Sequence, residues 1–173
     1  MEARLRKIRL LLLDVDGVMT DGRIVYDGNG VESKAFDVKD GHGLKLLQRA
    51  GVRVGIITGR SSEVVALRAA ELGIDILYQG AKDKLVPYRQ ILQDLGLHDE
   101  QVAYVGDDLV DLPILNRVGF SATVADGVEE LKPLVHHVAS RPGGRGAVRE
   151  ICDLLLKSSG QWRAVTDRYF GEG

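Results

Sequence analysis

Four short apolar segments, separated by stretches with helical periodicity, constrain the fold of this chain more than any other feature. Residues 8–15 form the longest segment and are rich in leucine, and shorter ones occupy residues 52–57, 74–77 and 102–105. Strands that are buried on both faces of a parallel sheet have such near-continuous apolar sequences. The four segments therefore predict the core strands of a mainly parallel sheet.

The intervening segments have the signals of helices. Apolar residues recur three or four positions apart over residues 85–95 and 148–155. Asp40, Ser61 and Asp83 stand where helix N-caps are expected, and Gly51, Gly73 and Gly96 stand where helices should end. Strands that alternate with helices in this way form right-handed βαβ units. The predicted fold class is α/β, with a doubly wound sheet flanked by helices.

Residues 23–36 interrupt this alternation. Two short extended segments enclose Asp27-Gly28-Asn29-Gly30, a composition typical of a β-hairpin turn. No other insertion of this size is present, so residues 1–158 are expected to form a single domain. Residues 159–173 lack clear periodicity and are expected to form a C-terminal tail.

Composition narrows the classes of function. The 23 Lys and Arg against 25 Asp and Glu give a net charge of −2, whereas nucleic-acid-binding proteins usually have a basic face. The first apolar segment is too short to cross a bilayer and is interrupted by Asp14 and Asp16, which also argues against a signal peptide. Cys152 is the only cysteine, so no disulfide can form within one chain. We expect a cytoplasmic protein with neither nucleic acid nor membrane as a partner.

Carboxylates cluster where two of the predicted strands end. Asp14 and Asp16 lie two residues apart, which places both on one face of an extended chain, and Asp107 and Asp111 follow the fourth strand. Ligands of open α/β sheets bind outside the carboxyl ends of the strands. Burying several carboxylates together is costly unless a cation offsets their repulsion. Because the cluster offers only oxygen donors, Mg²⁺ is the expected ion.

Thr58 and Lys84 complete a possible phosphate site. Thr58 ends the second core strand just before a helix, where a hydroxyl and free backbone N–H groups can hold an anion, and Lys84 can supply positive charge. Each signal alone is weak, since an Asp or Thr at a strand end is often a cap or turn residue. Their joint order at successive strand–helix junctions favours a functional site.

The motifs that carry this pattern resemble those of the haloacid dehalogenase superfamily of phosphatases: Asp14-x-Asp16-Gly17-Val18, Thr58-Gly59-Arg60, Lys84 and Gly106-Asp107-Asp108-x-x-Asp111. Two further blocks resemble the 3-deoxy-D-manno-octulosonate 8-phosphate (KDO 8-phosphate) phosphatase family: Asp37-Val38-Lys39-Asp40-Gly41 and residues 143–150. The resemblance covers about residues 11–156. It implies the Rossmannoid haloacid dehalogenase fold, with the hairpin but without a cap domain.

The resemblance also implies a reaction, the hydrolysis of KDO 8-phosphate to KDO and inorganic phosphate during lipopolysaccharide precursor synthesis. Asp14 would be the nucleophile that forms an aspartyl-phosphate, and Asp16 would act first as acid and then as base. Asp14, Asp107 and the main-chain carbonyl of Asp16 would bind Mg²⁺, while Asp111 would orient its water ligands. Thr58 and Lys84 would act with the metal on the phosphoryl oxygens.

A sugar acid carries a carboxylate as well as a phosphate, so a second anion site is expected. Arg60 and Arg68 are eight residues apart, with Val64 between them, and would lie on one helix face. Arginine matches the planar geometry of a carboxylate. The expected substrate-binding residues are Asp16, Asp37, Val38, Lys39, Asp40, Gly41, Lys45, Gly59, Arg60, Arg68 and Lys84. The alternative is that these cations are ordinary solvated residues on amphipathic helices.

Three other functions remain open at this point. A phosphatase for KDN 9-phosphate or a related nonulosonate would share the motifs. A signalling receiver also uses an acidic Mg²⁺ pocket with Thr and Lys, but it has no Asp two residues after the phosphorylated one, as Asp16 is here. A catalytically silent interaction protein is disfavoured by the intact motif set. The resemblance implies a homotetramer joined through its hairpins, and the aromatic tail is expected to be either a lid on a neighbouring subunit or a disordered end.

Overall fold

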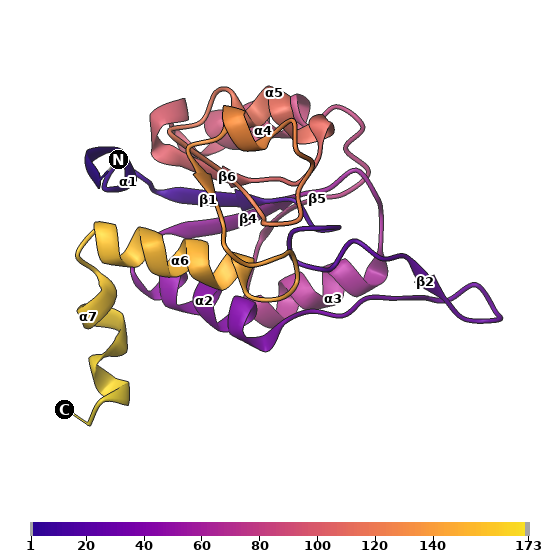
Figure 1. Ribbon diagram of the computed structural model, residues 1–173, viewed down its shortest axis with the longest axis horizontal. Coiled ribbons are helices and arrows are strands. Elements are labelled where there is room, and N and C mark those ends of the chain that lie inside the picture. Colours follow the sequence, from indigo (N-terminus) through magenta and orange to yellow (C-terminus); the bar gives the residue numbers. More distant parts are fainter. Residues whose placement is uncertain (1, 172–173) are drawn as a thin grey trace.

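A six-stranded parallel sheet forms the centre of the molecule, which is described over residues 2–171 by a computed structural model (Figure 1). The strand order is β5-β4-β1-β6-β7-β8, and every neighbouring pair is parallel. The strands are β1 (Leu10–Leu13), β4 (Arg53–Ile57), β5 (Ile76–Tyr78), β6 (Val102–Val105), β7 (Phe120–Thr123) and β8 (His137–Val138). The predicted α/β class is confirmed.

The central strand β1 fixes where the strand ends meet. Its four leucines are fully buried, because helices cover both faces of the sheet. Leu13 at its end pairs in register with Ile56 of β4 and with Val105 of β6. The residues that follow these three strands therefore leave the sheet at one edge.

Helices cover the two faces of the sheet in separate layers. One layer contains α2 (Val38–Arg49), α3 (Glu63–Leu72) and α6 (Ala147–Ser158), and the other contains α4 (Leu85–Leu95) and α5 (Leu112–Leu115), as Figure 1 shows. Short elements complete the chain: α1 (Glu2–Leu5), α7 (Trp162–Thr166) and four 3-10 turns, η1 (Asp99–Gln101), η2 (Leu109–Asp111), η3 (Lys132–Leu134) and η4 (Asp167–Tyr169). This is the doubly wound arrangement that the sequence predicts.

The predicted helix starts require correction. Helix α2 is capped by Asp37, whose side chain accepts hydrogen bonds from the backbone N–H groups of residues 39 and 40, so Asp40 is not its N-cap. Helix α3 begins after Ser62 rather than Ser61. Asp83 accepts a hydrogen bond from the Leu85 N–H, but Lys84 is the cap residue of α4. The predicted ends at Gly73 and Gly96 are confirmed, since both are left-handed C-caps.

The predicted hairpin extends away from the body of the molecule (Figure 1). It consists of β2 (Val25–Tyr26) and β3 (Glu32–Ser33), which are antiparallel and shorter than the predicted segments. Four large apolar side chains on it are at least half exposed: Ile24, Val25, Tyr26 and Val31.

The tail forms α7 and η4 and follows α6 (Figure 1). Val165 and Thr166 are buried, and the Tyr169 hydroxyl accepts a hydrogen bond of 2.6 Å from Arg49 Nη1 on α2. This contact ties the tail to α2 of its own chain. Within residues 2–171, no helix has the length and apolar character needed to span a membrane.

Candidate active site

Three carboxylates from two strand ends converge at the edge of the sheet. Asp14 follows β1, Asp107 follows β6, and Asp111 ends η2. One oxygen from each lies within 4.8 Å of the others. The predicted convergence of the two acidic motifs is therefore present in the folded chain.

Two glycines allow the carboxylates to come this close. Gly17 has a φ of +98°, and a Cβ at this position would lie 2.0 Å from Asp107 Oδ2. A Cβ at Gly106 would lie 2.4 Å from the Cβ of Asp111. Each acidic motif therefore needs glycine beside its aspartate, because any side chain there would displace the carboxylate of the other motif or of its own turn.

Lys84 is buried between two of the carboxylates. Its Nζ lies 2.9 Å from Asp14 Oδ1 and 2.7 Å from Asp111 Oδ1, and its side chain is 4% exposed. Burial alone would lower the pKa of Lys84, but the charges of Asp14 and Asp111 raise it above its usual value. Lys84 therefore remains a fixed ammonium group at the site.

The carboxylate of Asp111 is held entirely by protein donors. Oδ1 accepts a hydrogen bond of 2.6 Å from the Tyr104 hydroxyl in addition to the Lys84 contact. Oδ2 accepts from the backbone N–H groups of Asp107 at 3.0 Å and Asp108 at 3.3 Å. Because both carboxylate oxygens of Asp111 already accept hydrogen bonds from the protein, Asp111 suits a role in supporting the residues that bind the metal. Sequence reasoning missed Tyr104, because a tyrosine in an apolar strand resembles any other core residue.

Lys84 compensates only part of the negative charge of the three carboxylates. Burial, and then repulsion from Asp111, raises the pKa of Asp14 to about 6 despite Lys84. Burial, and then the charges of Asp14 and Asp111, raises the pKa of Asp107 to about 8. A divalent cation would offset this repulsion, and hard carboxylate oxygens are the donors that Mg²⁺ prefers. The residues present fit a Mg²⁺ ion.

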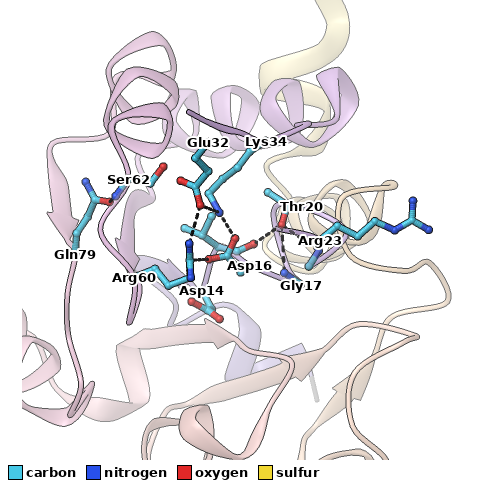
Figure 2. A network of polar contacts seen from close by, with 12 residues as sticks. Asp14, Asp16, Gly17, Thr20, Arg23, Glu32, Lys34, Arg60, Ser62 and Gln79 are labelled. Atoms are coloured by element: carbon cyan, nitrogen blue, oxygen red, sulfur yellow. Dashed lines mark hydrogen bonds and ion pairs between the residues drawn. The ribbon is translucent and has the colours of Figure 1, made fainter. Parts of the chain in front are cut away.

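Asp16 lies beside the hairpin, next to the predicted Arg60 and to Glu32 and Lys34, which sequence reasoning did not assign (Figure 2). Its Oδ1 accepts a hydrogen bond from Lys34 Nζ, and its Oδ2 lies 3.7 Å from Arg60 Nε. Glu32 contacts both cations, with Oε1 2.9 Å from Arg60 Nη2 and 3.4 Å from Lys34 Nζ. The available signal was the spacing of Glu32 and Lys34, which places both on one face of an extended chain.

Thr58 lies at the same edge of the sheet as the carboxylates. It is 2% exposed, and its backbone N–H donates to the Tyr78 carbonyl oxygen at 2.9 Å. Its own carbonyl accepts from the Ala81 N–H at 3.0 Å, which ties the end of β4 to the segment before α4. Gly59 is exposed and leads into the turn before α3.

Arg60 precedes α3, so it does not share a helix face with Arg68 as predicted. The expected sugar-acid residues near α2 divide into two groups. Arg68 belongs to α3, and its guanidinium group lies near the start of α2. Its Nη2 is 3.5 Å from the Asp37 carbonyl oxygen, and a Cβ at Gly41 would lie 2.4 Å from the same Nη2. Val38 and Lys39 are exposed beside them.

The second group, Asp40 and Lys45, lies away from the contact between Arg68 and Asp37. The Asp40 carboxylate accepts hydrogen bonds from the N–H groups of Gly146 at 3.3 Å and Arg149 at 2.8 Å, so it holds the start of α6. Lys45 Nζ lies beside the C-cap Gly73 of α3, 3.3 Å from where its Cβ would be. Within the described chain, Asp40 and Lys45 are thus engaged with neighbouring helices.

The sequence matches both a family model and a known protein of the same class. A family model for haloacid dehalogenase-like hydrolases matches residues 38–119. The chain is 49% identical to 3-deoxy-D-manno-octulosonate 8-phosphate phosphatase KdsC of Escherichia coli (strain K12) over 159 residues, 92% of this chain and 85% of that protein.

Solved structures are similar over almost the whole chain. The 3-deoxy-D-manno-octulosonate 8-phosphate phosphatase of Yersinia pestis superposes with a TM-score of 0.91 at 49% identity, covering 92% of this chain and 86% of that one. The Moraxella catarrhalis enzyme was solved in complex with magnesium ion, phosphate ion and KDO. It superposes with a TM-score of 0.94 at 40% identity and covers 97% of each chain.

Proposed function

The chain belongs to the 3-deoxy-D-manno-octulosonate 8-phosphate phosphatases, within the haloacid dehalogenase-like hydrolases, and from this membership and its site we propose the following activity. The protein is a Mg²⁺-dependent phosphoric monoester hydrolase that converts KDO 8-phosphate to KDO and inorganic phosphate. The observation that carries this function is the convergence of Asp14, Asp107 and Asp111 within 4.8 Å, beside the ammonium of Lys84.

In the first half-reaction, an oxygen of the Asp14 carboxylate attacks phosphorus while the bond from phosphorus to the sugar oxygen breaks. The Asp16 carboxyl gives its proton to that departing oxygen, so the sugar leaves as an alcohol. Mg²⁺ held by Asp14, Asp107 and the Asp16 carbonyl supplies positive charge to the phosphoryl oxygens when bound. The Lys84 ammonium and the Thr58 hydroxyl add fixed donors at the same oxygens.

In the second half-reaction, water attacks the aspartyl-phosphate. Asp16, now ionised, takes a proton from the water, and the bond from phosphorus to Asp14 breaks. Inorganic phosphate leaves and both carboxyl groups return to their first states. Asp111 holds Lys84 and the backbone of Asp107 in place throughout, through the contacts that occupy both its oxygens.

A substrate panel tests this function. We expect Mg²⁺-dependent phosphate release to be fastest with KDO 8-phosphate, slower with KDN 9-phosphate, and slowest with simple hexose phosphates. A preference for KDN 9-phosphate would reassign the substrate within the same chemistry. A phosphoryl group that persists on Asp14 without hydrolysis would instead indicate a signalling receiver.

We propose that the cationic side chains near α2 and α3 select the substrate. A variant of Arg68 tests this proposal. Arg68→Ala removes a guanidinium beside Asp37 and Gly41. Because a charged hydrogen bond contributes about 1.5–3 kcal/mol, KM for KDO 8-phosphate should rise about 10- to 100-fold. For p-nitrophenyl phosphate, which has no carboxylate, KM should change less than about 3-fold. Equal changes for the two substrates would remove Arg68 from the sugar-acid site.

Assembly and cellular role are also proposals. The exposed apolar residues Ile24, Val25 and Tyr26 give the hairpin a surface suited to contact between copies of the chain, and a homotetramer would enclose the open site. The tail could then cover a site on a neighbouring copy. The reaction would serve lipopolysaccharide precursor synthesis in the cytoplasm.

A further inference from the structure

A closed ring of alternating charges joins the hairpin to the loop after β1 (residues 14–20), here called the catalytic loop (Figure 2). Lys34 Nζ contacts Asp16 Oδ1 and lies 3.4 Å from Glu32 Oε1. The same Glu32 oxygen accepts a hydrogen bond of 2.9 Å from Arg60 Nη2, and Arg60 Nε lies 3.7 Å from Asp16 Oδ2. When Asp16 is ionised, two cations and two carboxylates thus neutralise one another around the site.

Lys34 is the most enclosed member of this ring. Its side chain is 1% exposed, against 18% for Asp16 and 40% for Arg60. Lysines on exposed hairpins normally extend into solvent, and an ammonium buried in protein is costly unless it is paired. The fold therefore places Lys34 against Asp16 although the hairpin offers it open water.

The backbone of the catalytic loop and the side chain of Asp16 are held by different groups. Thr20 holds the backbone: its hydroxyl accepts from the Gly17 N–H at 3.3 Å and donates to the Val15 carbonyl at 3.4 Å. Within residues 2–171, the Asp16 side chain has polar contacts with Lys34 and Arg60 alone. The direction of the Asp16 carboxyl group is thus set by these two cations.

We propose that Lys34 is a positioning residue for proton transfer by Asp16. A Lys34 N–H group donates to Asp16 Oδ1. Asp16 Oδ2 is therefore the oxygen that carries the proton, which passes to the departing sugar oxygen as the phosphorus–oxygen bond breaks. Lys34 keeps its own protons throughout. Arg60 is expected to bind the sugar carboxylate, so Lys34 is the contact that remains with Asp16 when substrate is bound. The assignment rests on the proposed function, because it requires Asp16 to be the acid.

The test compares two leaving groups. An alkoxide needs a proton as it departs, whereas p-nitrophenolate departs without one. Lys34→Met should therefore lower kcat/KM for KDO 8-phosphate by about 10- to 100-fold, the cost of a misdirected proton donor. For p-nitrophenyl phosphate the fall should be less than about 3-fold. Lys34→Arg should restore most of the loss, and Lys7→Met, an exposed control, should change neither rate.

A double-variant cycle separates positioning from folding. In an Asp16→Ala background the carboxyl group is already absent, so Lys34→Met should add no further loss with KDO 8-phosphate. Hydrogen exchange over residues 25–33 in each variant reports whether the hairpin has kept its structure. A hairpin that exchanges like wild type together with the selective loss supports the proposal.

Two results would overturn the role of Lys34. One is an equal loss for both esters, which would indicate a general structural effect. The other is a full additional loss in the Asp16→Ala background. Failure of the proposed function looks different: wild-type protein would then leave KDO 8-phosphate intact, and the leaving-group comparison would be made with whichever sugar phosphate it hydrolyses.

Discussion

Asp14→Asn is expected to abolish turnover while the fold remains intact. The amide is nearly isosteric with the carboxylate, and its oxygen can still accept a hydrogen bond from the Lys84 ammonium, now 2.9 Å from Asp14 Oδ1. It is not, however, a nucleophile toward phosphorus. Loss of an attacking group costs roughly 10⁴-fold or more in kcat in enzymes that react through a covalent intermediate. Phosphate release under saturating substrate and Mg²⁺ measures the effect.

The matched control is Asp94→Asn, the same change at an exposed carboxylate on α4 whose one side-chain hydrogen bond within residues 2–171 is with Gln90. It should keep kcat within about 2-fold of wild type, as surface substitutions usually do. Both variants should unfold at similar urea concentrations. An Asp14→Asn protein that folds and still turns over at the wild-type rate would mean that another group attacks phosphorus.

Removal of Mg²⁺ should eliminate activity and lower the melting temperature, and the second effect should depend on pH. Burial and neighbouring charges raise the pKa of Asp107 from 3.8 to about 8 in the metal-free protein. Between these values the native state binds more protons than the unfolded state, so the free energy of unfolding falls as pH rises through this window. Bound Mg²⁺ compensates the ionised carboxylates and removes that loss.

Saturating Mg²⁺ should therefore raise the melting temperature by about 5–10 °C at pH 8, as expected for ligand at roughly 100 times Kd and a domain of this size. At pH 5.5, protons compete for the carboxylates, and the increase should be less than about half as large. Asp107→Asn should make the metal-free protein more stable at pH 8 and abolish the Mg²⁺ effect, whereas Asp94→Asn should retain it. An equal Mg²⁺ effect at both pH values would contradict a metal site built on Asp107.

The core strands were predictable from the sequence because burial on both faces leaves a local signal. β1, β4 and β6 are nearly continuous apolar runs, so their ends could be located in advance, together with the aspartates that follow β1 and β6 and the threonine that follows β4. β7 was missed, since Ser121 and Thr123 alternate with its apolar residues even though all four are buried. β8 has only two residues, too few to produce a pattern.

Contacts between distant segments could not be predicted in the same way. Asp40 looks like a helix cap for its own segment, but its carboxylate holds α6, more than a hundred residues later. The sequence around Tyr104 carried no signal of its contact with Asp111, and the spacing of Glu32 and Lys34 showed only that they share a face, because the contacts with Asp111 and Asp16 exist only after the sheet and the hairpin have formed. Motif order located the reacting groups, and tertiary structure was needed to find the groups that hold them.

A crystal structure of the protein with Mn²⁺ and beryllium fluoride, a mimic of a phosphoryl group on aspartate, would examine the proposed chemistry at the atoms concerned. Anomalous scattering should place one metal ion between the carboxylates of Asp14 and Asp107, with oxygen ligands at roughly 2.1–2.2 Å. The beryllium should be bonded to an Asp14 oxygen, with Lys84 and Thr58 at its fluorides. Metal bound elsewhere, or beryllium fluoride on any other side chain, would contradict a phosphoryl-transfer site at Asp14.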